Sequence, residues 1–411
     1  MTHAPLAQQI TDYANRADPY PVYAELRKNP VHREGNGPFV VSTYWDIQGL
    51  LHDPRISSER RNRADAADSG LPEEEGGDDV LPPNFLRLDP PEHDRQRAMT
   101  NRPFGPPHSP RRIDGMRGEL HTIVTGLIDG LEGDTIDLVD RFSYPFPVTV
   151  ICRLLGVPRE DEPQFHGWAD TLVSTLDPRP DQDSAERLKV AKDARMQLGM
   201  YLAGLIEDRR KSPGDDMLSQ LVAGHGPDGP MSTMEVLSTA ALLLIAGHET
   251  TVNLITNGML TLLRHPDVLQ RLRDEPRLAV PIVEELLRYE PPVQLLPNRT
   301  PITDIEIRGV TIPKGSAMWL VLASGNRDPE RFENPDRFDP DRKDIQHLGL
   351  GSGIHSCFGA PLARLETQIA LVELARRLDN PRLVDDPPPY RRNAVLRGPR
   401  HLRIAIDGVR P

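Results

Sequence analysis

The 411-residue chain contains only two cysteines, Cys152 and Cys357, and aromatic residues make up 5% of it. Two cysteines are too few for a disulfide framework and are typical of a protein from a reducing compartment. The longest apolar run, from Ala240 to Ala246, is far shorter than the roughly 20 residues that cross a membrane. The N-terminal residues also lack the apolar core of a signal peptide. We therefore expect a cytoplasmic protein without a membrane span.

Positive charge is scarce as well, with 49 Lys and Arg against 61 Asp and Glu and a net charge of −12. This balance opposes nonspecific binding of nucleic acid, and no basic tract offsets it. Because no linker divides the chain, we expect one domain over residues 19–411. We also expect a tail over residues 1–18 and a monomer. Helical periodicity dominates that domain, which predicts a mainly α protein with small β-sheets, an α+β class. The expected helices cover residues 19–29, 45–53, 116–131, 137–155, 184–210, 232–263, 279–289 and 360–374, with strands or hairpins at 31–42, 305–307, 318–322 and 394–406.

The densest cluster of special residues is the run HLGLGSGIHSCFGAPLARLE, residues 347–366. Its glycines, Gly351 among them, permit tight turns and close approach of the main chain to a flat ligand. The helix expected over residues 360–374 tolerates Pro361 only in its first turn, so Cys357 should lie just ahead of a helix N-terminus. Unpaired amides and the positive dipole end favour a thiolate there. Such a thiolate is either a nucleophile or a metal ligand.

Three other interpretations of this run are weaker. A dinucleotide fingerprint starting at Gly349 would need a glycine where Ile354 stands, and no suitable strand precedes it. A zinc site would need more Cys or His ligands at short spacing, and Cys152 is the only other sulfur ligand. A buried structural thiol is the third possibility, and it describes Cys152 well.

The stretch from Ser232 to Leu263 predicts one long helix. Ser232 and Glu235 form an S-x-x-E capping box, and the helix should end at His265-Pro266. Its length would be roughly 45–50 Å at 1.5 Å per residue. The centre, ALLLIAGHETT over residues 241–251, is apolar nearly all round and should be buried.

Three polar residues lie inside that apolar helix: Glu249, Thr250 and Thr251. Threonine hydroxyls can bond back to helix carbonyls, and Gly247 weakens the helix, so we expect a local distortion that holds water. A zinc-binding HExxH motif fails because Val252 occupies the place of the second histidine. A helix-bending threonine beside a satisfied carboxylate is the alternative without chemistry.

Two further pairs share helix faces. His93 and Arg97 are four residues apart after Pro91 and could together hold an anion, although such a pair is more often a solvated face. Glu285 and Arg288 are three apart on the helix expected over residues 279–289, beside apolar neighbours.

The run from Leu350 to Gly359, followed by Leu362-Ala363-Arg364, resembles the haem-binding loop of the cytochrome P-450 family. The AGHETT stretch resembles the oxygen-activating helix of that family, and Glu285 with Arg288 resembles its E-x-x-R pair. The resemblance runs from about residue 19 to the C-terminus and implies the cytochrome P-450 fold, with a long central helix over the haem. It also implies that Cys357 is the axial thiolate ligand of haem iron. One departure is Leu350, where the family usually carries Phe beside the thiolate, and this affects redox tuning.

The resemblance implies roles for further residues. Glu249 and Thr250 would form an acid–alcohol pair that delivers the two protons needed to split dioxygen in a dry pocket. The Glu285–Arg288 pair would form an interior ion network with Arg337. The cofactor would be haem b, iron protoporphyrin IX. The cofactor-binding set would comprise His93, Arg97, Arg299 and His355 at the propionates, with Leu350, Gly351 and Gly359 in the loop.

The activity implied is that of a haem-thiolate monooxygenase, which inserts one oxygen atom from dioxygen into an apolar small molecule. The chain has no flavin or iron–sulfur motif, so electrons would come from a ferredoxin and its NAD(P)H-dependent ferredoxin reductase. A peroxide-driven oxygenase and a haem-based gas sensor or carrier are alternatives, and the Glu249–Thr250 pair counts against both. The substrate would be a terpenoid, steroid or macrolide-like skeleton. A basic docking patch for ferredoxin would include Arg95, Arg102, Arg111, Arg112 and Arg364, and the pocket would be lined by Leu243, Ala246, Val293, Leu295, Leu296 and Val395.

The segment between Ser58 and Asn84 is polar and acidic, without usable periodicity. A loop of this length is usually functional or disordered. The resemblance favours a lid over the substrate pocket, and a floppy acidic insertion is the other possibility. The irregular piece from Leu172 to Asp183 is expected to border the entrance, and the tip of a hairpin over residues 394–406, near Val395 and Leu396, is expected to close the pocket.

Overall fold

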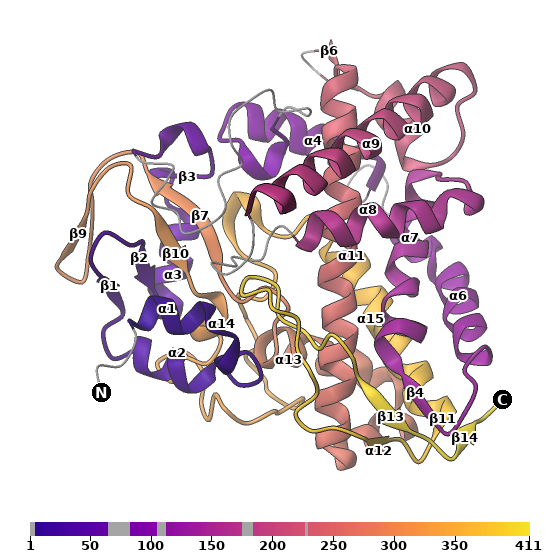
Figure 1. The fold of residues 1–411 in the computed structure, drawn as a ribbon. Coiled ribbons are helices and arrows are strands. Elements are labelled where there is room, and N and C mark those ends of the chain that lie inside the picture. Colours follow the sequence, from indigo (N-terminus) through magenta and orange to yellow (C-terminus); the bar gives the residue numbers. More distant parts are fainter. Residues whose placement is uncertain (1–4, 65–82, 105–111, 175–183, 227–228) are drawn as a thin grey trace.

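The computed structural model describes residues 5–64, 83–104, 112–174, 184–226 and 229–411. Helices form most of this part of the chain, and the 32-residue α11 (Thr233–Arg264) runs through the middle of the molecule (Figure 1). The mainly α prediction is therefore confirmed. The remaining helices are α1 (Leu6–Thr11), α2 (Tyr20–Leu26), α3 (Tyr44–His52), α4 (Glu92–Phe104), α5 (Arg112–Gly115), α6 (Arg117–Asp129), α7 (Pro145–Leu155), α8 (Glu162–Ser174), α9 (Ser184–Lys211), α10 (Met217–Ala223), α12 (Pro266–Asp274), α13 (Ala279–Tyr289), α14 (Leu322–Gly325) and α15 (Ala360–Arg377).

The strands are short and form small sheets at one side and along the base of the helical body, with β6 at the opposite, upper end (Figure 1). None of the helices in the described ranges is long and apolar enough to cross a membrane. The strands are β1 (Val31–Arg33), β2 (Phe39–Val41), β3 (Ile56–Ser57), β4 (Thr135–Asp137), β5 (His225–Gly226), β6 (Gly229–Pro230), β7 (Leu296–Pro301), β8 (Ile305–Ile307), β9 (Val310–Ile312), β10 (Met318–Leu320), β11 (Leu378–Asp379), β12 (Arg382–Leu383), β13 (Arg403–Ala405) and β14 (Gly408–Val409).

Helix α11 begins where the capping box predicts. The Ser232 hydroxyl accepts from the Glu235 amide at 3.2 Å, and the Glu235 carboxylate accepts from the Ser232 amide at 2.8 Å. The main apolar core surrounds this helix, with α7 and α15 packed directly against it. A Cβ at Gly247 would lie 2.6 Å from the Ile151 side chain, so glycine is needed for α7 to approach this closely. The helix is continuous through Gly247, and the distortion expected there does not interrupt it.

The five-stranded sheet joins residues 31–57 to residues 296–320, with strand order β1-β2-β10-β7-β3. Figure 1 shows the indigo N-terminal strands beside the orange strands from residues near 300. The hairpin predicted over residues 31–42 is present as β1 and β2, and Met318 of β10 pairs with both Phe39 and Arg299. At the far edge, Ser57 of β3 pairs with Thr300 of β7, which places residues 57–58 next to Arg299.

The N-terminal residues contribute to the core. In the expected tail, α1 places Ile10 in an apolar cluster with Tyr23 and Leu26, and Ile10 is fully buried. The buried Arg397 donates to the carbonyl oxygens of Arg16 and Ala17, at 2.8 and 2.7 Å. Residues 6–17 are therefore packed on the domain.

The bounds predicted for the C-terminal hairpin, residues 394–406, are wrong. The chain turns back on itself earlier, between Tyr390 and Pro399, and this turn contains the predicted tip near Val395 and Leu396. Strand β13 pairs with the preceding strand β12 and with β4 from a distant part of the chain. Leu396 instead forms an isolated bridge with Val293. The alternation in this stretch reflects pairing with other segments, because a short strand can take any partner with a free edge. Most of the expected lid, residues 65–82, and residues 175–183 of the expected entrance lie outside the described residues.

Candidate active site

The Cys357 loop is held by its own backbone and by the start of α15. The amide of Cys357 donates to the carbonyl of Leu350 at 2.8 Å, which closes the loop over the glycines. The amides of Gly359 and Ala360, at the N-terminus of α15, point at the thiol. The predicted position of Cys357 ahead of a helix N-terminus is therefore confirmed.

Close packing explains the glycines of this loop. Gly353 has φ +69°, and a Cβ there would lie 2.0 Å from the carbonyl oxygen of Leu51. A Cβ at Gly349 would lie 2.1 Å from the carbonyl oxygen of Leu287. The loop is thus pressed between α3 and α13, and no side chain larger than hydrogen fits at either position.

Cys357 faces a cavity rather than bulk solvent. The exposed surface of Cys357 belongs to the wall of this cavity, and the thiol itself is closely surrounded by protein atoms. Burial raises the pKa of the Cys357 thiol, although the two helix amides, Arg97 and Arg364 oppose this rise. The helix amides favour the thiolate, as the sequence predicts, but burial outweighs them. A bound metal cation would supply the missing positive charge, since coordination deprotonates a thiol.

The cavity lies between the Cys357 loop, α7 and the middle of α11. Its lining is mostly apolar, and Leu243, Ala246 and Thr250 of α11 contribute to it, as predicted for the first two. Leu295, by contrast, is packed in a separate cluster with Tyr23 and Trp319 and does not line the cavity. The other predicted lining residues, Val293, Leu296 and Val395, do not line the cavity either. Three phenylalanines that the sequence reasoning missed line it instead: Phe85, Phe104 and Phe358.

Thr250 and Glu249 lie on different sides of α11. The Thr250 hydroxyl lines the cavity and donates to the carbonyl of Ala246 at 2.7 Å. Thr251 bonds back to Gly247 in the same way, at 3.1 Å, as predicted. Glu249 is 1% exposed and does not line the cavity. Its Oε1 lies 3.1 Å from Nε of Arg391, a residue that sequence reasoning did not single out.

A set of cationic and donor groups lies at one edge of the cavity. The rings of His93 and His355 are 4.5 Å apart, and Nε2 of His355 lies 2.9 Å from the Ser58 hydroxyl. Arg97 donates to the Ser356 carbonyl at 2.7 Å. Burial, followed by the charges of Arg299, His93 and Arg97, lowers the pKa of His355 to about 3. The structure thus brings together the four residues predicted to hold the propionates.

These groups fit an anionic cofactor. Burial lowers the pKa of Arg299 to about 10, and no carboxylate of the described chain lies within ion-pair distance of Arg299 or Arg97. Nε2 of His93 and Nδ1 of His355 are buried without a hydrogen-bond partner among the described residues. Buried cations and donors of this kind need anionic partners. A flat dianionic group with a metal at its centre would satisfy both these groups and the Cys357 sulfur.

Glu366 is a further polar residue of the cavity that sequence reasoning missed. It is 1% exposed, lines the cavity from α15, and its Oε2 has no hydrogen-bond partner within the described chain. Burial raises the pKa of Glu366 well above its ordinary value and so favours the neutral form of this carboxyl. Its position, two turns into α15 after Cys357, is the only sequence signal that could have found it.

Glu285 and Arg288 form the buried pair that was predicted. The guanidinium of Arg288 donates two bonds of 2.7 Å to Glu285 and three more to the carbonyls of Asn326, Pro335 and Arg337. The predicted role of the Arg337 side chain is wrong, because that side chain is exposed and only its carbonyl takes part. The second guanidinium belongs to Arg342, whose Nε lies 3.4 Å from Glu285.

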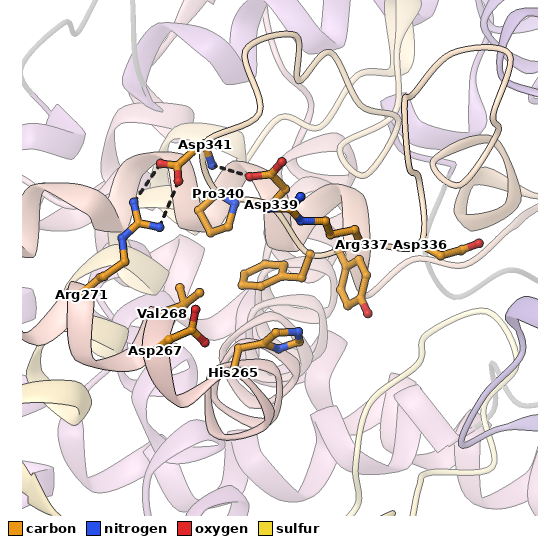
Figure 2. Close-up of a pocket in the computed structure, with 11 residues that line it drawn as sticks. His265, Asp267, Val268, Arg271, Asp336, Arg337, Asp339, Pro340 and Asp341 are labelled. Carbon is orange, nitrogen blue, oxygen red and sulfur yellow. Dashed lines mark hydrogen bonds and ion pairs between the residues drawn. The ribbon is translucent and has the colours of Figure 1, made fainter.

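A second hollow lies at the surface between α12 and the loop over residues 336–341 (Figure 2). It shares no lining residue with the Cys357 cavity. Arg271 and Asp341 form a bidentate ion pair across its rim, at 2.9 and 3.0 Å. The hollow lacks a thiol and a buried unpartnered carboxyl, so we place the chemistry at the Cys357 cavity.

The fold and the cavity together define a protein with a site, between a long central helix and a cysteine loop, that fits a planar cofactor with a metal at its centre. The family model described as Cytochrome P450 matches residues 84–406, and the chain belongs to the cytochrome P450 family. It is similar to the cytochrome P450 monooxygenase PikC of Streptomyces venezuelae, with 40% identity over 94% of this chain and 91% of that protein. It is 39% identical to the vitamin D(3) 25-hydroxylase of Pseudonocardia autotrophica, over 95% of this chain and 94% of that protein.

Solved structures agree with this assignment. The bacillaene polyketide synthase cytochrome P450 PksS of Bacillus subtilis superposes with a TM-score of 0.87 at 32% identity, over 99% of this chain and 100% of that one. The protein is therefore a cytochrome P450 monooxygenase, and its family implies a haem cofactor.

Proposed function

We propose that this protein uses haem b, held by Cys357, to insert one oxygen atom from dioxygen into an apolar small molecule. The observation that carries the proposal is the cavity in which the Cys357 thiol, the Thr250 hydroxyl and buried cationic groups meet. The haem would supply oxygen activation and oxygen-atom transfer, with the thiolate ligand donating electron density. The chain supplies the metal ligand, the propionate partners, a dry pocket and proton delivery.

The residues have separate tasks in this proposal. Arg97 and Arg299 would neutralise the two propionates, which removes the cost of burying unpaired cations. His93 and His355 would hydrogen-bond to the propionates. The Thr250 hydroxyl, already oriented by its bond to Ala246, would hold a proton at the cavity wall. Glu249 would take up protons from solvent and pass them to the Thr250 hydroxyl at the cavity wall. The apolar lining excludes water from the rest of the cavity.

We propose a separate ferredoxin with an NAD(P)H-dependent ferredoxin reductase as the electron source. The predicted basic patch carries less net positive charge than its five arginines indicate, because carboxylates of the chain pair with two of them. Arg364 binds Glu284 through bonds of 2.6 and 2.9 Å, Arg95 binds Glu235 and Glu92, and Arg111 lies outside the described residues. We propose that Arg102 and Arg112, the other two described members of the patch, contribute to the docking of an acidic ferredoxin. Reversing both charges should slow turnover and flatten its salt dependence, and unchanged kinetics would refute the docking site.

The lining points to a bulky apolar substrate, such as a steroid or a macrocyclic skeleton. Because the haem would lie between α11 and the Cys357 loop, a substrate of that kind would pack on the α11 side, against the leucines of that helix. The similarity to a vitamin D(3) 25-hydroxylase supports this size class.

The test is product formation by purified, haem-loaded protein with a panel of such compounds. One arm supplies dioxygen, ferredoxin, reductase and NADPH, and the other supplies hydrogen peroxide alone. We expect oxygenated product in the first arm, and Thr250→Ala should lower its yield per NADPH by roughly 10-fold or more. Product in the peroxide arm alone, unaffected by Thr250→Ala, would favour the peroxide-driven alternative. Binding of gases without oxidation in either arm would favour a sensor.

A further inference from the structure

A stripe of buried polar residues runs along α11 beside the cavity-facing side. Glu249, Asn253 and Asn257 are four residues apart, so they share one face of the helix. All three are at most 2% exposed. Nδ2 of Asn253 donates to Oε1 of Glu249 at 3.3 Å, and Nδ2 of Asn257 donates to the carbonyl of Arg397 at 3.0 Å. The stripe therefore contacts the C-terminal segment rather than the cavity.

The C-terminal segment over residues 390–399 covers this stripe. The segment turns back on itself, because the Arg391 amide donates to the Gly398 carbonyl at 3.0 Å and Tyr390 bridges to Pro399. A Cβ at Gly398 would lie 2.1 Å from Oδ1 of Asn253, so the segment touches α11 with bare backbone. Because the Arg391 amide is bonded to Gly398, this contact also holds the backbone of Arg391 close to α11.

The side chain of Arg391 bridges solvent and the buried carboxylate. Its Nε lies 3.1 Å from Oε1 of Glu249, and the two side chains are 15% and 1% exposed. Burying a carboxylate favours its neutral form unless a cation faces it. An arginine stays protonated in proteins, so it can hold and release a carboxylate but cannot itself pass on a proton.

We propose that Arg391 is a positioning residue for Glu249. It keeps the carboxylate ionised on the solvent-linked side of α11, from which Glu249 can take up a proton and turn toward the Thr250 hydroxyl. No bond other than to that proton is made or broken, and the guanidinium keeps its charge throughout. The inference rests on the proposed function, because it assigns Glu249 the proton delivery of the monooxygenase.

The test compares Arg391→Gln and Arg391→Lys in the haem-loaded protein, with Arg400→Gln as a matched control. Arg400 is a surface arginine directly after this segment, and it pairs with Asp140 at 3.0 Å. We expect Arg391→Gln to lower product per NADPH by roughly 10-fold and to increase the solvent deuterium isotope effect. Lysine should restore most of the yield, and the control should match the wild type.

A double-mutant cycle separates positioning from a general structural role. In a Glu249→Gln background, Arg391→Gln should change product yield less than twofold, and it should shift the urea midpoint of unfolding less than it does in the wild type. Equal effects of Arg391→Gln in both backgrounds would overturn the proposal. An unchanged isotope effect in Arg391→Gln would overturn it too. If instead the reduced carbon monoxide complex of the wild type lacks a thiolate-type spectrum, the proposed function itself fails.

Discussion

Replacing Arg288 by alanine should destabilise the protein far more than replacing Arg337. All five N–H donors of the Arg288 guanidinium are used, two on Glu285 and three on main-chain carbonyls. Arg288 is 0% exposed and Glu285 1%, so the substitution leaves a buried carboxylate and three buried carbonyls with fewer partners. Breaking a buried pair in this way typically costs about 3–5 kcal/mol. Arg342 and the Asp339 amide still contact Glu285, which favours the lower end, about 3 kcal/mol.

The effect should extend to the Cys357 loop. Asn326, which accepts from Arg288 through its carbonyl, also accepts from the Leu348 amide at 2.7 Å through its side chain. The assay is urea unfolding followed by circular dichroism, with haem content measured from the ratio of haem to protein absorbance. We expect Arg288→Ala to lower both the urea midpoint and the haem content. Arg337→Ala should lower neither, because only the main-chain carbonyl of Arg337 takes part in the network. Equal midpoints and haem contents for the two variants would refute this account of the network.

Two further predictions concern the glycine loop and an acid-sensitive pair. Gly353→Ala should lose haem and cost at least about 1–3 kcal/mol of stability, because its Cβ would meet the Leu51 carbonyl. Gly309 also has a positive φ, +76°, but open space around it, so Gly309→Ala measures the cost of backbone strain alone. Equal losses of stability in the two variants would contradict the clash at Gly353. His347 and Arg364 outweigh burial and lower the pKa of Glu284 to about 2, so its contribution to stability is present above pH 4.5 and is lost as the pH falls toward 2. The urea midpoint of Glu284→Gln should therefore lie below that of the wild type at pH 7, with a gap that narrows below pH 4.5, and a gap independent of pH would be inconsistent with the pair.

Much of the candidate site could be predicted from residue order because its parts are local. The capping box of α11, the helix after Cys357 and the Glu285–Arg288 pair each depend on residues within one or two helical turns. Helical periodicity and capping chemistry determine such features with little help from the rest of the fold.

The remaining features depend on long-range packing, which spacing does not encode. Sequence alone could not show that Arg342 rather than Arg337 would direct its guanidinium at Glu285, since both lie in one irregular loop. Nor could it show that Arg391 would reach Glu249 from 142 positions away, or that β13 would pair with the distant strand β4. The lining by Phe85 and Phe104 likewise arises from where α4 and its preceding turn pack against Phe358.

The central claim is that the sulfur of Cys357 is the axial ligand of a bound haem. The most direct measurement is the absorption spectrum of the reduced protein under carbon monoxide, for the wild type and for Cys357→Ser. The wild type should show the red-shifted Soret band of a thiolate-ligated haem, and the variant should lack it. The same band in Cys357→Ser, or no haem uptake by well-folded wild-type protein, would contradict the claim.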